Sequence, residues 1–291
     1  MKRILLILLL TLPILSGYSA LAETKRALLI GISDYGNEME DPTKWDNING
    51  VNDIKILSPL FKEQGFQVST LVDGQATHDG IINALKNIIK DSEPGDVVYV
   101  HFSMHGQPFE DLNGDEEDGW DEALIPVDAQ MEYKEGVYEG QNHLLDDELE
   151  IYFNDIRTKI GPTGNLYVVL DACHSGSASR GDNSKVRGVK EGFTRSGKPY
   201  IVDRTKESND YFDVDTKPGQ SPVMFVEACR SYQANKEVRD KTTNKWYGPL
   251  SFYIAQAMEN NEIVGSEGWL ESIRKEMDKK TKQNMVIERS K

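Results

Sequence analysis

The sequence predicts an α/β fold in which a mostly parallel central sheet is flanked by helices. Several runs of strand length are apolar almost throughout, which is typical of parallel strands that are buried on both faces. Segments with apolar residues at helical spacing lie between most of these runs. This alternation of strands and helices indicates a parallel sheet with helices on both faces.

Five segments have the composition of strands. The first, residues 26–32, is an almost continuous apolar run, whereas residues 66–72 alternate between apolar and polar side chains. The other three are expected over residues 96–102, 165–170 and 221–227.

Helical patterns fill most of the intervals between these strands. Residues 52–64 have an apolar side chain at every third or fourth position, and Gly65 follows as a stop. Thr77 can cap a second helix. The remaining helices are expected over residues 146–159, 250–259 and 267–280.

Three stretches carry no such pattern. A long acidic loop follows the third strand, residues 176–220 have the polar composition of one long mobile loop, and a polar tail ends the chain. The chain has 291 residues and no internal repeat. We therefore expect one domain over residues 23–291, with a core at about 24–260 and a C-terminal segment of helix and polar tail over 261–291.

The first 22 residues have the features of a secretory signal peptide. A positively charged start precedes a short apolar stretch, and the small-residue sequence Ala20-Leu21-Ala22 predicts cleavage after Ala22. The apolar stretch is short for a bilayer span, so an uncleaved membrane anchor is the weaker alternative. We expect an exported protein, periplasmic or extracellular, with no stable membrane anchor.

The net charge limits the classes of binding partner, and the two cysteines indicate how the fold is stabilised. A formal net charge of −15 makes the chain a poor candidate for nucleic-acid binding and favours divalent metals or basic peptides. Cys173 and Cys229 could form a disulfide in an exported protein, but Cys229 ends an apolar run and has the setting of a packed thiol. The protein must rely on a packed core for stability.

Two strand ends carry reactive side chains. His105 and Gly106 follow the third strand, and Cys173 follows the fourth. Because the carboxyl ends of parallel strands meet at one edge of a sheet, we expect the imidazole and the thiol to lie close together. An adjacent imidazole activates a thiol as a nucleophile and supplies the proton for the leaving amine, and backbone N–H groups in such turns can form an oxyanion hole.

Three blocks of sequence resemble the signature blocks of caspase-like cysteine peptidases (family C14). They are residues 27–35, Ser103-Met104-His105-Gly106 and Asp171-Ala172-Cys173-His174-Ser175-Gly176. The last block is similar to the metacaspase branch, of which we expect this chain to be a bacterial member, and Met104 stands where that branch usually has glycine. The resemblance implies a caspase-like (caspase-hemoglobinase) sandwich, with His105 and Cys173 as the catalytic pair and Gly106 at the oxyanion turn.

The resemblance also implies cleavage after Arg or Lys, because acidic residues line the pocket for that side chain in metacaspases. The matching substrate-binding positions here are Asp53, Ser103 and Asp171. A carboxylate at a strand end would pair with a guanidinium or an ammonium group. The alternative for Asp53 is an ordinary acidic residue in the first turn of a helix.

Calcium is a candidate ligand, although no cofactor is required by the predicted chemistry. Some metacaspases bind an activating calcium ion through aspartates in the acidic loop and in a later Asp-Asp pair. The corresponding residues would be Asp118 or Asp121 in the loop, together with the pair Asp146 and Asp147. The alternative is a solvated acidic loop in which Asp146 caps the third helix.

The loop at 176–220 is rich in basic residues. An enzyme that prefers such residues could cut itself there, and the alternative is a basic surface loop. The basic residues are Arg180, Lys185, Arg187, Lys190, Arg195 and Lys198.

The leading functional hypothesis is a cysteine endopeptidase that acts on peptides or proteins with basic residues. A catalytically silent module that binds peptide or protein partners is the alternative. A third hypothesis is a hydrolase or transferase that uses the same pair of residues on a non-peptide acyl group.

Overall fold

The structure is a computed structural model. It describes residues 23–114, 116, 118–173, 185–189, 191–201, 211–266, 268–281 and 283–290, with the backbone alone at 211–213. The signal-peptide prediction for residues 1–22 lies outside this range, as do Arg180 and Lys190 of the basic loop.

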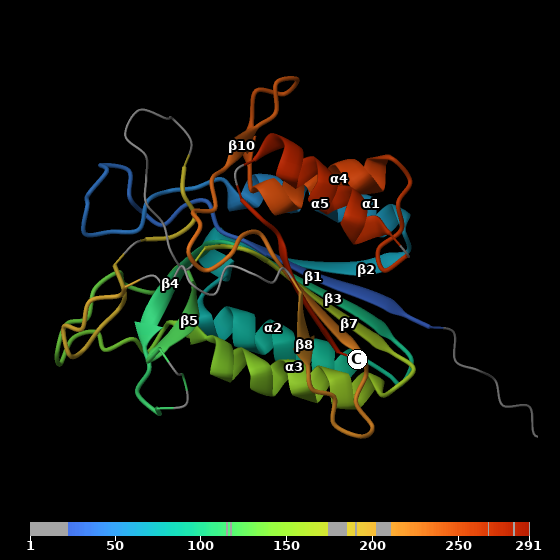
Figure 1. Cartoon of the computed structure of the whole chain (residues 1–291), viewed down its shortest axis with the longest axis horizontal. Helices are drawn as coiled ribbons and strands as arrows, with labels where there is room; N and C mark the ends of the chain where they lie inside the picture. Colours follow the sequence, from blue (N-terminus) through green and yellow to red (C-terminus); the bar gives the residue numbers. More distant parts are fainter. Residues whose placement is uncertain are drawn as a thin grey trace, which may run out of the picture.

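A seven-stranded sheet forms the centre of the protein, in the order β2-β1-β3-β7-β9-β12-β8 (Figure 1). The first five strands in this order are parallel, whereas β12 is antiparallel to β9 and parallel to β8. The strands are β1 (Lys25–Gly31), β2 (Phe66–Val72), β3 (Val97–Ser103), β7 (Asn165–Asp171), β8 (Tyr211–Val214), β9 (Val223–Glu227) and β12 (Val286–Ser290). The predicted α/β class with a mostly parallel sheet is confirmed.

Helices cover both faces of this sheet (Figure 1). One face carries α1 (Gly50–Glu63), α4 (Pro249–Glu259) and α5 (Trp269–Lys280), and the other carries α2 (His78–Asp91) and α3 (Asp146–Ile160). All five predicted helices are present, with ends within two residues or so of the expected positions.

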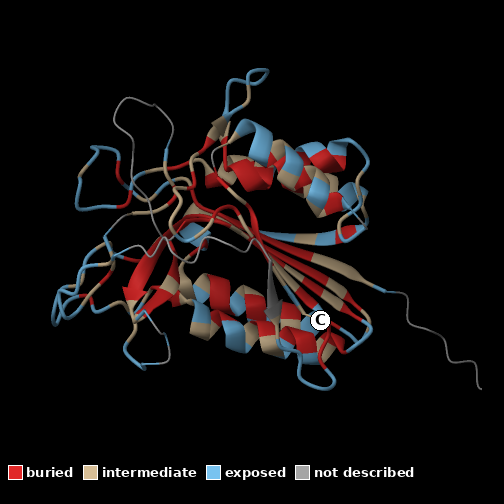
Figure 2. Ribbon diagram, in the orientation of Figure 1, coloured by how far each residue is buried: buried red, intermediate tan, exposed pale blue. Residues whose placement is uncertain are grey.

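The two helical layers explain the continuous apolar run of β1. Leu28 and Ile30 belong to the core beneath α2 and α3, while Ala27 and Leu29 belong to the core beneath α1, α4 and α5. All four residues are almost completely buried, and the strands at the centre of the sheet are coloured largely as buried in Figure 2. A strand that packs against a layer on each face has no solvent side, so the alternation of apolar and polar residues disappears.

Three stretches predicted as loop or tail contain strands. The acidic loop holds a small antiparallel sheet of β4 (His105–Glu110), β5 (Trp120–Ile125) and β6 (Leu144–Leu145). Strand β8 falls within the predicted loop at 176–220, and β12 falls within the polar tail. Polar or charged residues interrupt the apolar pattern of most of these strands, as Glu288 and Arg289 do in β12, so their pairing with neighbouring strands, not their own sequence, determines their structure.

The remaining regular elements are short. They are a 3-10 turn at Asp73–Gln75 and the pair β10 (Val238–Arg239) and β11 (Trp246–Tyr247). Among the described residues, no helix has the length and apolar character needed to cross a membrane.

The C-terminal strand is expected to be essential for stability. Ile287 in β12 is 3% exposed and packs in the core beneath α5, so Ile287→Asp should lower the free energy of unfolding by more than about 4 kcal/mol, because it removes a buried apolar group and buries an unpaired charge. Urea unfolding of a Cys173→Ala background measures this change. Arg289→Asp is the matched control at an exposed position of the same strand; equal losses in both variants would contradict the placement of β12.

Candidate active site

His105 begins β4 and is separated from the end of β3 by Met104 alone. Its Nε2 lies 2.8 Å from the carbonyl oxygen of Asp46. A carbonyl oxygen can only accept, so Nε2 carries the hydrogen and Nδ1 has the free lone pair. Nδ1 is buried and has no hydrogen-bond partner among the residues that the structure describes.

The environment of His105 keeps its ring neutral. The rings of Tyr35 and Trp45 lie against the imidazole, with centroid distances of 5.0 and 5.1 Å. Burial lowers the pKa of His105 to about 4, and the charge of Arg187 acts in the same direction, against the opposing hydrogen bond to Asp46. A neutral imidazole with an open Nδ1 can accept a proton at pH 7.

Cys173 lies two residues after the end of β7 and is 1% exposed. Its thiol donates to the carbonyl oxygen of Gln233 at 2.8 Å. Cys229 donates to the same oxygen at 3.4 Å. A hydrogen bond with Cys173, together with burial, raises the pKa of the Cys229 thiol. The two cysteines are not joined by a disulfide.

The parallel register brings the predicted residues to one edge of the sheet. Ser103 at the end of β3 lies beside Asp171 at the end of β7, so His105 and Cys173 leave the sheet from neighbouring strands. Within the described part of the chain, no hydrogen bond joins the Cys173 thiol to the imidazole. The thiol has to turn from Gln233 before it can transfer a proton to Nδ1.

The carbonyl group of Arg187 lies against the candidate nucleophile. Its oxygen accepts hydrogen bonds from the backbone N–H of Cys173 at 3.0 Å and of Gly106 at 3.2 Å. Two backbone donors that point at one carbonyl oxygen, one of them from the candidate nucleophile residue itself, have the arrangement of an oxyanion hole. The next residue, Gly188, allows this approach because a side chain there would overlap the carbonyl oxygen of Cys173.

The chain before Gly188 is held in an extended form. The N–H of Arg187 donates to the carbonyl of Asn235, and the N–H of Glu237 donates to the carbonyl of Lys185, both at 3.0 Å. Val186 also forms an antiparallel bridge with Lys236. Residues 185–187 therefore pair with residues 235–237 in the same way that a bound extended peptide pairs with an exposed strand.

The three predicted pocket residues surround the guanidinium group of Arg187. Its Nη1 is 2.8 Å from Asp53 Oδ2, 2.7 Å from Ser103 Oγ and 3.3 Å from the carbonyl oxygen of Asp171. The Asp171 carboxylate is farther away, at 3.7 Å. Ser251 donates to that carboxylate through both its N–H and its hydroxyl. Asp53 also lies in the first turn of α1. Its position therefore fits both a pocket residue and an acidic residue in the first turn of a helix.

Glu237 is a third acidic residue in this pocket, and the sequence analysis missed it. Its Oε1 is 3.0 Å from Arg187 Nη2 and 3.3 Å from Arg187 Nε. Asn49 donates to both carboxylate oxygens of Glu237, through its N–H at 2.7 Å and its Nδ2 at 2.6 Å. The side chain of Glu237 is fully buried.

Arg187 is fully buried, so the surface-loop alternative is wrong for this residue. Burial alone would lower the pKa of Arg187, but the charges of Asp53, Asp171 and Glu237 outweigh it and raise the pKa above its usual value. The guanidinium is therefore charged, and three carboxylates compensate the cost of burying it.

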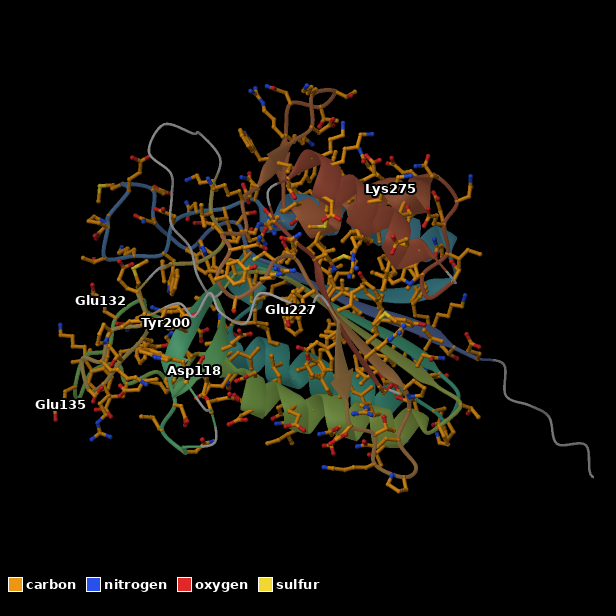
Figure 3. All side chains as sticks on the ribbon, in the orientation of Figure 1. Asp118, Glu132, Glu135, Tyr200, Glu227 and Lys275 are labelled. Atoms are coloured by element: carbon orange, nitrogen blue, oxygen red, sulfur yellow. The ribbon has the colours of Figure 1, made fainter. Side chains whose placement is uncertain are left out.

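The four residues predicted for calcium do not gather into one cluster. Asp118 lies in the turn before β5 (Figure 3), where its Oδ1 accepts from the N–H of Trp120, and Asp121 lies within β5. Asp146 and Asp147 begin α3 and line an acidic cavity of about 550 Å³. Among the described residues, no group of three or more acidic, histidine or cysteine side chains could hold a metal ion.

Asp46, Gln233 and Asn235 also contact the candidate site and were not predicted. Asp46 and Gln233 act through carbonyl groups, and a backbone group leaves no signal in the choice of residue. Asn235 donates through its side chain to Asp171 Oδ1 at 2.7 Å, but it lies in a polar stretch that has no strand or helix pattern.

A family model described as a metacaspase, peptidase C14 domain, matches residues 25–180 of the chain. Metacaspase-1B from Aspergillus fumigatus is 34% identical over 172 residues, which are 55% of this chain and 38% of the relative. Metacaspase-1 from Eremothecium gossypii is 32% identical over 168 residues, which are 55% of this chain and 34% of the relative. The chain thus spans well under half the length of these curated relatives.

One solved structure has a similar fold over nearly the whole chain. The crystal structure of protein GSU0716 from Geobacter sulfurreducens matches with a TM-score of 0.60 and 20% identity, and the match covers 92% of this chain and 93% of that protein. At this level of identity, the likeness shows the fold alone.

Proposed function

Because the chain belongs to the metacaspase family of peptidase C14, we propose that it is a cysteine endopeptidase with Cys173 as nucleophile and His105 as its acid and base. It cuts after basic residues, and the first bond that it cuts is its own Arg187–Gly188 bond. The observation that carries this proposal is the position of Arg187, whose carbonyl oxygen meets the N–H groups of Cys173 and Gly106 while its side chain meets acidic residues.

The reaction begins with the thiol. Cys173 transfers its proton to Nδ1 of His105, and the sulfur attacks the carbonyl carbon of Arg187. Negative charge develops on the carbonyl oxygen, where the N–H groups of Cys173 and Gly106 stabilise it. Nε2 stays hydrogen bonded to Asp46, so the imidazolium that forms keeps its orientation.

The peptide bond breaks in the second half of the reaction. The bond between the Arg187 carbon and the Gly188 nitrogen opens, and Nδ1 of His105 returns its proton to the nitrogen, which becomes a new amino terminus. Water then hydrolyses the thioester, which leaves a carboxylate on Arg187 and restores the thiol. The basic side chain of any other substrate has to replace Arg187 among the acidic residues.

A panel of fluorogenic peptides that end in Arg, Lys or Asp tests the proposal. The purified residues 23–291 should turn over the basic peptides and not the Asp peptide, since the carboxylate of an Asp side chain would be repelled from a pocket lined by Asp53, Asp171 and Glu237. Turnover of the Asp peptide alone would contradict the basic preference, and no turnover of any peptide would favour a silent module.

Calcium dependence and export stay predictions. The described residues offer no metal cluster at Asp118, Asp121, Asp146 and Asp147, so no step of the reaction is assigned to calcium. Running the same peptide panel in chelator and in added calcium separates an activating ion from an indifferent one. The proposal of export rests on residues 1–22 alone.

A further inference from the structure

We propose that Glu237 makes the pocket selective for arginine over lysine. The inference rests on the proposed peptidase function, since it treats Arg187 as the side chain that occupies the substrate pocket. It assigns to Glu237 a role that neither the sequence motifs nor the pair Asp53 and Asp171 supplies.

The pocket contacts the guanidinium group on two different edges. Asp53, Ser103 and the Asp171 carbonyl all meet Nη1 at one end. Among the described residues, Glu237 alone meets the other edge, where Nε and Nη2 both point at its Oε1. Arginine presents donors in a fixed planar fork and can satisfy both edges at once.

A lysine side chain can satisfy only one of these edges. Its ammonium group has a single nitrogen, which can reach the position of Nη1 and bond Asp53 and Ser103. Nothing in lysine corresponds to Nε and Nη2, so Oε1 of Glu237 would lose both contacts from the substrate. The side chain of Glu237 has no exposed surface, so water cannot replace the lost donors without opening the pocket.

Asn49 holds Glu237 in the orientation that this recognition needs. It donates to Oε1 through its N–H and to Oε2 through its side chain. These two bonds keep the carboxylate in place but leave it negatively charged beside the pocket. A substrate side chain that presents donors to both edges of the pocket is therefore preferred. We expect kcat/KM for peptides with arginine to exceed kcat/KM for peptides with lysine by about 100-fold.

The test compares peptides that differ only in having Arg or Lys before the fluorophore. In Glu237→Gln the preference for Arg should fall at least about tenfold, because a neutral amide oxygen accepts more weakly from Nε and Nη2. Asp53→Asn is the matched control. It removes charge from the edge that both side chains reach, so it should lower both rates together and leave the preference within about threefold.

Urea unfolding of Glu237→Gln shows whether this variant is folded. A second variant, Glu237→Asp, tests the same contact with the charge retained. The Asp side chain keeps the charge but is shorter than the distance to the guanidinium requires, so it should also reduce the preference. Equal rates for Arg and Lys in the unmodified protein would overturn the inference and leave the peptidase intact, as would a Glu237→Gln variant with an unchanged ratio. If the protein cleaves neither after Arg nor after Lys, both the peptidase proposal and this inference are overturned.

Discussion

Cys173→Ala is expected to stop both self-cleavage and the turnover of basic peptides, with a loss of more than about 10⁴-fold. The thiol is the atom that forms the thioester, and no other described nucleophile lies where it could replace it: Cys229 shares the Gln233 carbonyl but has a pKa raised by its bond to Cys173 and by burial. The measurement is the rate of fluorophore release, together with the length of the purified chain on a denaturing gel.

Cys229→Ala is the matched control for this change, because it removes the other buried thiol. It should keep turnover within about tenfold of the original, since the Cys229 thiol donates to the carbonyl oxygens of Ala172 and Gln233, whereas the Arg187 oxygen accepts from Cys173 and Gly106. Turnover that survives in Cys173→Ala and disappears in Cys229→Ala would reverse the assignment of the nucleophile.

Asp53→Asn is expected to lower kcat/KM for basic peptides by roughly 10²- to 10³-fold. Asp53 is fully buried and makes the shortest ionic contact to the guanidinium group, at 2.8 Å. Loss of one partner from a buried charge pair costs about 2–5 kcal/mol in binding. Self-cleavage should slow in the same variant, because Arg187 depends on the same carboxylate.

Glu63→Gln at the other end of α1 is the control for this variant, since Glu63 is exposed. It should leave the rates unchanged. If Asp53→Asn cleaves Arg peptides at the original rate while unfolding at the same urea concentration, Asp53 has only the structural role of an acidic residue in the first turn of a helix.

The sequence alone predicts the frame of the active site well. Apolar runs such as that of β1 and helical spacing such as that of α1 are local patterns, and they imply which strand ends meet. Ser103 and Asp171 lie side by side because β3 and β7 are parallel and in register. The positions of the candidate catalytic residues follow from this topology.

The contents of the pocket could not be predicted in the same way. Arg187 lies in a polar stretch whose composition favours a surface loop, and its burial depends on carboxylates contributed by distant segments. Glu237 follows the fifth predicted strand without any periodic pattern. Such interactions combine residues far apart in the chain, and a single sequence does not reveal which acid will meet which base.

The segment after Gly188 is also held by tertiary contacts. Phe193 is 2% exposed and stacks on Phe109 of β4, with ring centroids 4.9 Å apart. Its backbone bonds to Pro108 and Glu110. Because β9 and β12 belong to the central sheet, the two pieces of a chain cut after Arg187 should stay together until they are denatured.

The most direct test is therefore the mass and the N-terminal sequence of the pieces obtained when the purified protein is denatured. The proposal predicts a C-terminal piece that begins Gly188-Val189 and a matching piece that ends in Arg187, both absent from Cys173→Ala. A chain that stays whole while it cleaves Arg peptides, or a new amino terminus at any other residue, would contradict the position of Arg187 as the first bond cut.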